Sequence, residues 1–447
     1  MSPDNHRPTH MQKHSARPSR MKAWAFLSIA LLCTAVACNN LLDVKSPDAI
    51  NATSLDNPLI AEQTVNASIG DFDCALSSYV VAAGLMSGEL TDATLTASRW
   101  SYDRRDIDPN ESAYSTNDCL ESDLGTYTPI STARFTADRI LALLEGWTDD
   151  SVPNRSFLIS EAASFGGYTR ILLGEGFCNA AIAGGPSLTS AQVFALATGK
   201  FDTAVTAAQA ALDAAVSAHD TTAAGQDSSA LYLALVGRAR SSLDAGQNAQ
   251  AIADASLVPP GFVYNATYDA GTDNRTNHVY TENNADQTVS VAPPYENLND
   301  PRVPVTNKNK TASDEKTPLF TQGKYADGSA PIPIASYVEA QLILAEATGG
   351  SGAITILNNL RSSAGLGALA SSSDPAVITA DIASERARWL WLQGQHLYDV
   401  RRLGLPLVPA AGSSYSIYYH KGGSYGSETC MPIPAVETNN NPNAGGG

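Results

Sequence analysis

A few sequence patterns could support chemistry, but none of them forms a complete catalytic motif. Residues 422–426 read Gly-Gly-Ser-Tyr-Gly and match the Gly-x-Ser-x-Gly pattern of a serine nucleophile. That motif needs a strand–turn–helix context and a histidine later in the chain, and no histidine follows Ser424. The sequence also lacks a His-Glu-x-x-His zinc motif, a P-loop and a dinucleotide fingerprint. We therefore expect a loop at residues 422–426, no catalytic residue, no metal and no cofactor.

Charged residues recur along a helix predicted near the C-terminus. Glu385 and Arg388 stand three positions apart, as do Asp399 and Arg402, so each pair can form an ion pair on one helix face. The apolar stripe of this helix includes His396, which we expect to be a hydrogen-bonded core histidine rather than a metal ligand. Acid–base or anion chemistry is the alternative. We favour the structural interpretation, because an unpaired buried charge would be costly.

The N-terminus reads as an export signal. Basic residues precede an apolar run that is too short to anchor the chain across a bilayer. Small residues stand directly before Cys38, a pattern that suits signal peptidase II, whose product carries lipid on the cysteine. We expect a signal peptide over residues 1–37, with Met21 as an alternative start, and lipidation of Cys38 as a durable membrane anchor. An ordinary secretory signal with a structural thiol at Cys38 is the alternative.

Two of the six cysteines lie in or directly after this leader, and the other four suggest disulfides. In an oxidising compartment four cysteines form two bridges in one of three pairings. We favour Cys74–Cys119 and Cys178–Cys430, of which the second would join an early helix to the C-terminal tail. Metal ligation is the weaker alternative, because the spacings contain no Cys-x-x-Cys.

Composition excludes several classes of partner. The formal net charge is −17, and the acidic excess grows when the basic leader is removed. This balance argues against binding nucleic acid and against basic patches for anionic lipid. Outside the leader no segment approaches about 18 continuous apolar residues, so we expect no transmembrane helix in the mature chain. Residues 38–447 suffice for a large core, and the abundant alanine favours helix.

Helical periodicity dominates the chain. Residues 231–255 have the spacing of a tetratricopeptide helix pair, which must stack on neighbouring pairs to bury its apolar face. Small residues at 162–167 favour a close approach between helices. Residues 259–334 differ, because proline, glycine, asparagine and tyrosine replace the apolar period; we interpret them as a loop-rich excursion and a candidate functional surface. The predicted helices cover residues 58–90, 130–147, 157–183, 190–218 (one helix or two), 231–243, 249–255, 336–347, 353–364 and 377–403.

Several short segments, in order along the chain, resemble the SusD/RagB family of nutrient-binding lipoproteins. Cys38 is followed by Leu-Asp-Val and then by a proline, as at the start of mature family members. The excursion contains Asn-Asp-Pro-Arg at residues 299–302, similar to the family's Asp-Pro-Arg turn. Residues 337–347 resemble its Ala-Glu-Ala helix, and residues 357–366 resemble its Leu-Asn-x-Val-Arg-x-x-Ala-Gly-Leu segment.

The C-terminal part carries the strongest resemblance. A Glu-Arg pair at residues 385–386 is followed by Asp-Val-Arg-Arg-x-Gly at residues 399–404, and residues 432–443 resemble the closing Pro-Ile-Pro-x-x-Glu…Asn-Pro-Asn signature. The chain departs from the family at Gln393, where glutamate is usual. The resemblance implies a mainly α fold, in which tetratricopeptide-like helix pairs form a SusD-like scaffold with a loop-rich irregular subdomain. It also implies that residues 38–447 form a single SusD-like domain that includes the 259–334 excursion.

The resemblance further implies capture of a nutrient without catalysis. A family member would sit in the outer membrane, lipid-anchored at the cell surface, and pass an oligosaccharide or another nutrient to a SusC-like TonB-dependent receptor. Ligand contacts are expected in two loop regions, where aromatic faces can stack on sugars and polar groups can bind hydroxyls. The candidate ligand residues are Trp100, Tyr102, Asn110, Tyr114, Tyr264, Tyr268, Tyr280 and Tyr295. The alternative for each is that it pins a loop to the helical scaffold.

Two other functions remain open from the sequence. One is a surface glycoside-active enzyme, because the paired carboxylates of such enzymes meet only in space; no motif supports it. The other is a tetratricopeptide scaffold that binds protein partners. Ligand identity, anchor orientation and oligomeric state do not follow from the sequence.

Overall fold

A computed structural model describes residues 56–119, 124–271, 275–415 and 421–444. The expected signal peptide, Met21 and the lipidation site Cys38 lie outside these described residues. The chain divides into two units, Met1–Asp56 and Asn57–Gly447, and every helix and strand below belongs to the second.

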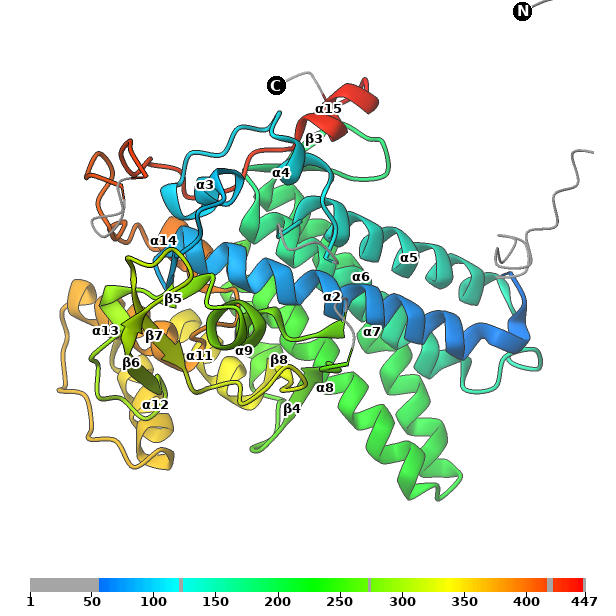
Figure 1. The fold of residues 1–447 in the computed structure, drawn as a ribbon. Helices are drawn as coiled ribbons and strands as arrows, with labels where there is room; N and C mark the ends of the chain where they lie inside the picture. Colours follow the sequence, from blue (N-terminus) through cyan, green and yellow to red (C-terminus); the bar gives the residue numbers. More distant parts are fainter. Residues whose placement is uncertain (1–55, 120–123, 272–274, 416–420, 445–447) are drawn as a thin grey trace, which may run out of the picture. The chain divides into compact units, whose positions relative to one another are not determined.

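Helices make up most of this unit, as the periodicity predicts (Figure 1). The long helices of the first half are α2 (Ala61–Ser87), α5 (Tyr127–Gly146), α6 (Arg155–Gly176), α7 (Ser190–Ser217), α8 (Thr221–Asp244) and α9 (Asn248–Ala255). The second half contains α11 (Tyr337–Thr348), α12 (Gly350–Ser363), α13 (Pro375–Trp389) and the shorter α14 (His396–Arg402) and α15 (Ala435–Asn440). Short helical segments are η2 (Pro58–Ile60), η3 (Ala97–Arg99), α3 (Trp100–Arg104), α4 (Ser112–Thr116), α10 (His278–Tyr280), η5 (Thr281–Ala285) and η6 (Pro293–Tyr295).

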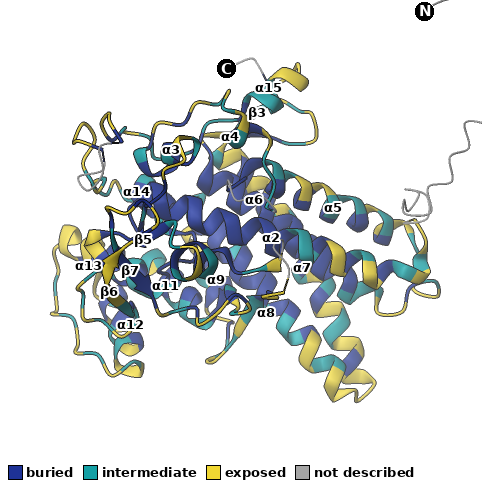
Figure 2. Ribbon diagram, in the orientation of Figure 1, coloured by how far each residue is buried: buried dark blue, intermediate teal, exposed yellow. Residues whose placement is uncertain are grey.

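The central helix of the core is α2, which Figure 2 shows buried along much of its length. Residues Pro58–Ser87 are long and apolar enough to cross a membrane, but 83% of the most apolar window is buried inside the protein. Its side chains pack against α5 and α6, as in the ring contact between Phe72 and Phe165 at 5.2 Å between centroids. The apolar character of α2 is therefore that of a core helix.

Glycines set the close packing of α6, α7 and α8. The ring of Phe201 on α7 lies between Gly167 of α6 and Gly237 of α8. A Cβ atom at either glycine would lie within 2.6 Å of a ring carbon, closer than side chains pack. The close helix approach predicted for residues 162–167 is confirmed at Gly167, where the missing side chain leaves room for the ring.

The strands form four two-stranded antiparallel sheets within the described residues. Three of these sheets use strands of the 259–334 excursion, which is therefore less irregular than its composition predicts. The pairs are β1 (Leu90–Asp92) with β5 (Val289–Val291), β2 (Asn179–Ala181) with β3 (Ser187–Thr189), β4 (Val263–Ala266) with β8 (Ile332–Ser336), and β6 (Val305–Thr311) with β7 (Pro318–Gln322).

The single helix predicted over residues 377–403 is wrong. Helix α13 ends at Trp389 and α14 begins at His396, with positive φ angles at Leu392 (54°) and Gly394 (80°) between them. The break places Trp391 in the core with no exposed surface, and the backbone N–H of Leu392 donates to Glu89 at 3.0 Å. Packing against the end of α2 thus overrides a local sequence that favours helix.

The helix predicted over residues 157–183 is also too long at its C-terminal end. Helix α6 ends at Gly176, and Phe177 is extended. The next residues pair with the C-terminal segment: Met431 donates to the Gly176 carbonyl at 2.8 Å, and Cys178 donates to the Met431 carbonyl at 2.9 Å. The end of α6 is therefore fixed by a segment more than 250 positions away.

Disulfides join Cys74 to Cys119 and Cys178 to Cys430. These are the two pairs that we favoured from the sequence. The first ties α2 to the loop after α4, and the second ties the loop after α6 to the C-terminal segment. The loop after α4 and the C-terminal segment are thereby linked covalently to the helical scaffold.

Candidate functional site

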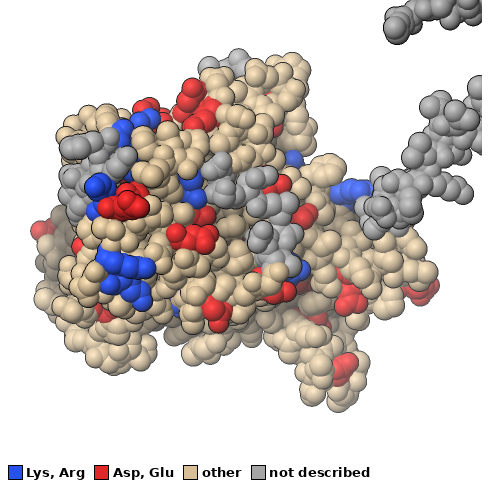
Figure 3. Space-filling model, in the orientation of Figure 1, with Lys and Arg blue, Asp and Glu red and all other residues tan. Residues whose placement is uncertain are grey.

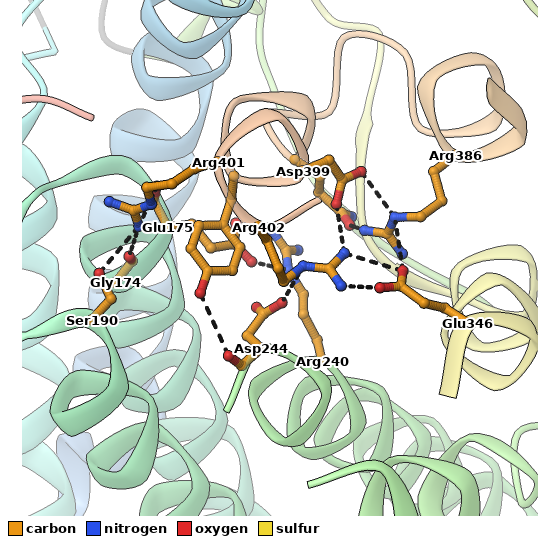
Figure 4. Close-up of polar contacts among 12 residues, drawn as sticks. Gly174, Glu175, Ser190, Arg240, Asp244, Glu346, Arg386, Asp399, Arg401 and Arg402 are labelled. Carbon is orange, nitrogen blue, oxygen red and sulfur yellow. Dashed lines mark hydrogen bonds and ion pairs between the residues drawn. The ribbon is translucent and has the colours of Figure 1, made fainter. Parts of the chain in front are cut away.

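The C-terminal arginines form a buried charge network with acidic residues of neighbouring helices (Figure 4). Asp399 accepts from Arg386 and from Arg402, each at 2.8 Å, which confirms the predicted Asp399/Arg402 pair. Arg402 also binds Glu346 of α11 through both terminal nitrogens. Burial alone would raise the pKa of Asp399, but the two guanidinium groups lower it to about 2.

The same network reaches α6 and α8. Arg240 binds both oxygens of Glu175 at 2.6 Å. Arg401 donates to the carbonyl of Gly174 at 2.7 Å and to that of Phe177 at 3.2 Å (Figure 4 draws the first). A cation at a helix C-terminus satisfies carbonyls that have no partner within the helix. These contacts tie α14 to the last turn of α6.

From their spacing we expected Glu385 to pair with Arg388, but the structure gives each of them other partners. Glu385 binds Arg302 and Arg361, each at 2.6 Å, whereas Arg388 lies 3.4 Å from Asp300. The Asp-Pro-Arg turn packs over α13, where Arg302 binds Glu385 and its guanidinium lies 5.1 Å from the centroid of the Trp389 ring. The turn thereby fastens the excursion to α13.

These charges compensate one another inside the scaffold, so the network has a structural role. Among the described residues, no group of three or more His, Cys, Asp or Glu side chains is placed to hold a metal ion. The arrangement holds five helices together, namely α6, α8, α11, α13 and α14.

His396 differs from the core histidine that we expected. Its Nδ1 atom has no hydrogen-bond partner among the residues that the structure describes, and burial lowers the pKa of the imidazole. The side chain lines a cavity of about 230 Å³, together with Tyr295, Pro294 and Leu405. Tyr295 stacks on the core ring of Trp391 at 6.1 Å between centroids. The cavity is mostly apolar, and His396 is one of its few polar groups.

Four of the candidate ligand tyrosines are buried, and the structure argues against a stacking role for them. Tyr102, Tyr114, Tyr268 and Tyr295 are each less than 10% exposed. The hydroxyl of Tyr102 donates to the Leu124 carbonyl at 2.7 Å, and the hydroxyls of Tyr114 and Tyr268 likewise donate to backbone carbonyls. These rings pin loops to the scaffold, because a buried hydroxyl needs a partner and the backbone supplies it.

The other four candidates retain partial or full exposure. Trp100 is partly buried, and its indole N–H donates to the Thr94 carbonyl at 3.1 Å. Asn110 is exposed on a turn, where its amide bonds to a neighbouring aspartate. Tyr280 is partly exposed, and the partly exposed Tyr264 donates to Glu161 at 3.1 Å. Trp100 thus remains the best aromatic candidate of this set.

Trp100 lies beside a buried lysine that holds three distant segments together. The ammonium of Lys421 is 5.4 Å from the Trp100 ring centroid and 2.8 Å from Asp92. It is also 4.0 Å from Asp314 of the excursion. A desolvated cation over an indole is attractive, so the lysine fixes the orientation of the ring.

A cleft in the excursion was not predicted residue by residue. It has a volume of about 510 Å³ and opens between the 296–305 loop and the β6–β7 pair. Asn297 and Asn299 lie on its exposed rim, and neither amide side chain makes a hydrogen bond within the described residues. The cleft is lined by Glu296, Asn297, Leu298, Asn299, Asp300, Pro301, Val303, Pro304, Val305, Asn307 and Phe320.

The chemistry of this cleft suits a ligand rich in hydroxyl groups. Amides both donate and accept hydrogen bonds, and Glu296 adds a carboxylate whose pKa is raised by burial. Apolar side chains such as Phe320 and Leu298 add surface for the C–H faces of a sugar. The signal for this site in the sequence was the polar run at residues 296–301. Its composition predicts a loop, but the cleft forms only when this loop folds against β6 and β7.

Charge near the cleft is mixed. Lys308 and Lys310 are exposed on β6, and Figure 3 shows a group of basic side chains over the β6–β7 pair. Lysines on an exposed strand edge discourage pairing with another chain.

Comparisons with known proteins support the resemblance found in the sequence. A model of the SusD family matches residues 263–444, a range that contains the cleft and the arginines Arg386, Arg401 and Arg402 of the charge network. No curated protein matches the chain.

Solved structures of SusD-like proteins share the fold of this chain. A SusD superfamily protein from Bacteroides fragilis superposes with a TM-score of 0.61 at 12% identity, covering 87% of this chain and 99% of its own. A laminarin-binding SusD-like protein gives a TM-score of 0.60 at 14% identity, with coverage of 85% and 97%. Surface glycan-binding protein A from Bacteroides thetaiotaomicron, in complex with laminarihexaose, gives 0.60 at 13% identity, with coverage of 86% and 97%. Over residues 263–444 the chain therefore matches the SusD family, and its described part has the mainly α fold of SusD-like proteins.

Proposed function

We propose that this protein captures a glycan at the bacterial cell surface and passes it on without chemical change. The observation that carries the proposal is the SusD family match over the segment that contains the open polar cleft. Two proteins of the same fold are described as binding laminarin or laminarihexaose. The free amides at the cleft rim fit hydroxyl recognition, and the charged residues of the C-terminal network are tied to one another.

The cleft at residues 296–307 is the proposed primary contact. Asn297 and Asn299 would bond sugar hydroxyls, and Phe320 and Leu298 would cover a sugar face. Each such hydrogen bond contributes about 1 kcal/mol net, which corresponds to roughly fivefold in affinity. Trp100 is proposed as a second, aromatic contact, because its ring is partly exposed and held in place by Lys421.

Calorimetry against a panel of purified oligosaccharides tests this proposal. We expect saturable binding of at least one neutral glycan, a loss of roughly 25-fold for the Asn297→Ala/Asn299→Ala double variant, and a smaller loss for Trp100→Ala. Asn66→Ala is the matched control, since Asn66 is an exposed amide on α2 outside the cleft. Equal affinity of the double variant and the control would show that the cleft is not the binding site.

We further propose that Cys38 carries the lipid anchor and that a SusC-like TonB-dependent receptor receives the glycan. The order of signal, small residues and cysteine supports the anchor, and the family match supports the receptor partnership. In cells, Cys38→Ser should move the protein from the membrane fraction to the soluble fraction, whereas Cys33→Ser should leave it membrane-bound. Affinity purification from detergent-solubilised membranes should recover a TonB-dependent receptor. Unchanged membrane attachment of Cys38→Ser would contradict the anchor, and recovery of outer-membrane assembly proteins instead would contradict the receptor partnership.

A further inference from the structure

A second groove lies at the far end of the helical scaffold from the cleft-bearing excursion. Its volume is about 500 Å³, and it separates the tip of the α7–α8 hairpin from the α5–α6 loop. Figure 1 shows this hairpin extending beyond the neighbouring helices. The groove is lined by Glu62, Asp149, Val152, Pro153, Asn154, Arg155, Ser156, Phe157, Leu158, Ala210, Ala211, Ala214, Ala215, Ala218, Asp220, Ala223, Gln226 and Asp227.

The lining of this groove is mixed, with more polar than apolar exposed surface, and one of its walls consists of small apolar side chains. Five alanines of residues 210–218 form one wall, along one face of the end of α7. The opposite wall contains Val152, Phe157 and Leu158. Because alanines project only one carbon, the backbone of another polypeptide could lie close against α7. The groove is thus shaped for an extended chain with a slender side chain.

A buried carboxylate at the groove has no partner. Asp227 is only 6% exposed, and within the described residues it makes no hydrogen bond and no ion pair. Burial raises the pKa of its carboxyl group, and the nearby charge of Asp220 raises it further. The oxygen atoms of this carboxylate are not enclosed by the protein but face the groove, where a cation from outside could pair with them.

The remaining charges of the groove do not supply this cation. Arg155 is the one basic lining residue, and it binds Asp149 at 2.6 Å and the Leu144 carbonyl at 3.1 Å. Glu62 adds a negative charge at the rim, and Asp220 caps the first turn of α8. The groove therefore has an acidic excess that is not balanced from within.

We propose that this groove binds a basic segment of a partner polypeptide, with one lysine or arginine side chain reaching Asp227. The aliphatic stem of such a side chain would lie against the alanine wall, and its charged head would meet the carboxylate. The net charge of −17 would attract a basic segment before contact. The proposal does not depend on the glycan function, because the groove and the cleft share no lining residue.

Fluorescence anisotropy with a labelled peptide tests the proposal on the full chain. The probe is a short Ala/Gly peptide with one central lysine, and its matched partner carries glutamine in place of the lysine. We expect the lysine peptide to bind and the glutamine peptide to bind at least about tenfold more weakly. Asp227→Asn should weaken the lysine peptide by a similar factor, whereas Asp213→Asn should not, since Asp213 is exposed on α7 outside the groove.

A steric variant separates groove filling from loss of charge. Ala214→Trp fills the groove from an exposed helix position and should abolish binding of the lysine peptide, while Gln209→Trp, outside the lining, should not. Equal binding of the lysine and glutamine peptides, unchanged binding by Asp227→Asn, or no binding of either peptide by the folded wild-type protein would each overturn the proposal. Glycan affinity of the same variants should stay at the wild-type value, so failure of one function is distinguishable from failure of the other.

Discussion

Replacing Gly237 by alanine tests the packing that holds the three long helices together. A Cβ at this position would lie 2.2 Å from a carbon of the Phe201 ring, whereas carbon atoms pack at about 3.5–4.0 Å. The ring cannot retreat, because a Cβ at Gly167 on its other side would lie only 2.6 Å away, so that backbone is close as well. Overpacking of this kind costs about 1–3 kcal/mol. The higher helix propensity of alanine stabilises the helix by about 1 kcal/mol relative to glycine. We therefore expect Gly237→Ala to lower the free energy of unfolding by up to about 2 kcal/mol.

The matched control lies on the same helix. Gly225 is exposed on α8, and nothing lies within 4 Å of the Cβ that alanine would add there. Gly225→Ala should therefore raise the free energy of unfolding by about 0.5–1 kcal/mol. Urea denaturation followed by circular dichroism measures both variants. A double-mutant cycle with Phe201→Leu should recover much of the loss in Gly237→Ala, because the smaller side chain leaves room for the methyl group. Equal stability of Gly237→Ala and Gly225→Ala would refute this account of the helix packing.

Two further predictions concern pH and the disulfides. Burial raises the pKa of Glu161 from 4.5 to about 7, so the folded protein keeps a proton that the unfolded chain releases, and stability should fall as pH rises from about 4.5 to 7. Glu161→Gln should reduce the dependence of the unfolding free energy on pH and raise the unfolding free energy at pH 7. The same pH dependence in the variant and the wild type would contradict the raised pKa of Glu161. Replacing both Cys178 and Cys430 by serine should cost about 5.5 kcal/mol, against about 4 kcal/mol for Cys74 and Cys119, because the separations are 252 and 45 residues. Thermal unfolding of the two double variants measures the difference, and a larger loss for the shorter loop would contradict the chain-entropy reasoning.

Much of the helical scaffold could be predicted from the sequence, because its helices carry clear apolar periods. The ends of helices could not. The break between α13 and α14 depends on Glu89, a residue about 300 positions earlier, which accepts from the backbone at Leu392. The end of α6 likewise depends on Met431, whose backbone N–H donates to the carbonyl of Gly176. Local helix propensity does not predict contacts between segments that lie so far apart in the chain.

The candidate site was harder to predict than the fold. Tyr102 and Tyr268 were reasonable ligand residues by type and region, but the folded chain buries them and binds their hydroxyls to the carbonyls of Leu124 and of Asp73 on α2. The cleft with Asn297 and Asn299 arises from the path of one loop past β6 and β7, and its sequence shows only a polar run. Residue type indicated what chemistry was available. Only the fold showed which side chains remain free to use it.

The central claim is capture of a glycan without turnover, and one measurement tests it directly. The purified protein is incubated with each glycan that calorimetry shows to bind, and the glycan is then analysed by chromatography and mass spectrometry. The account predicts saturable binding, weakened by the Asn297→Ala/Asn299→Ala variant, and full recovery of the intact glycan after prolonged incubation. Shortened products that accumulate with time and protein concentration would contradict it and would establish the chain as an enzyme.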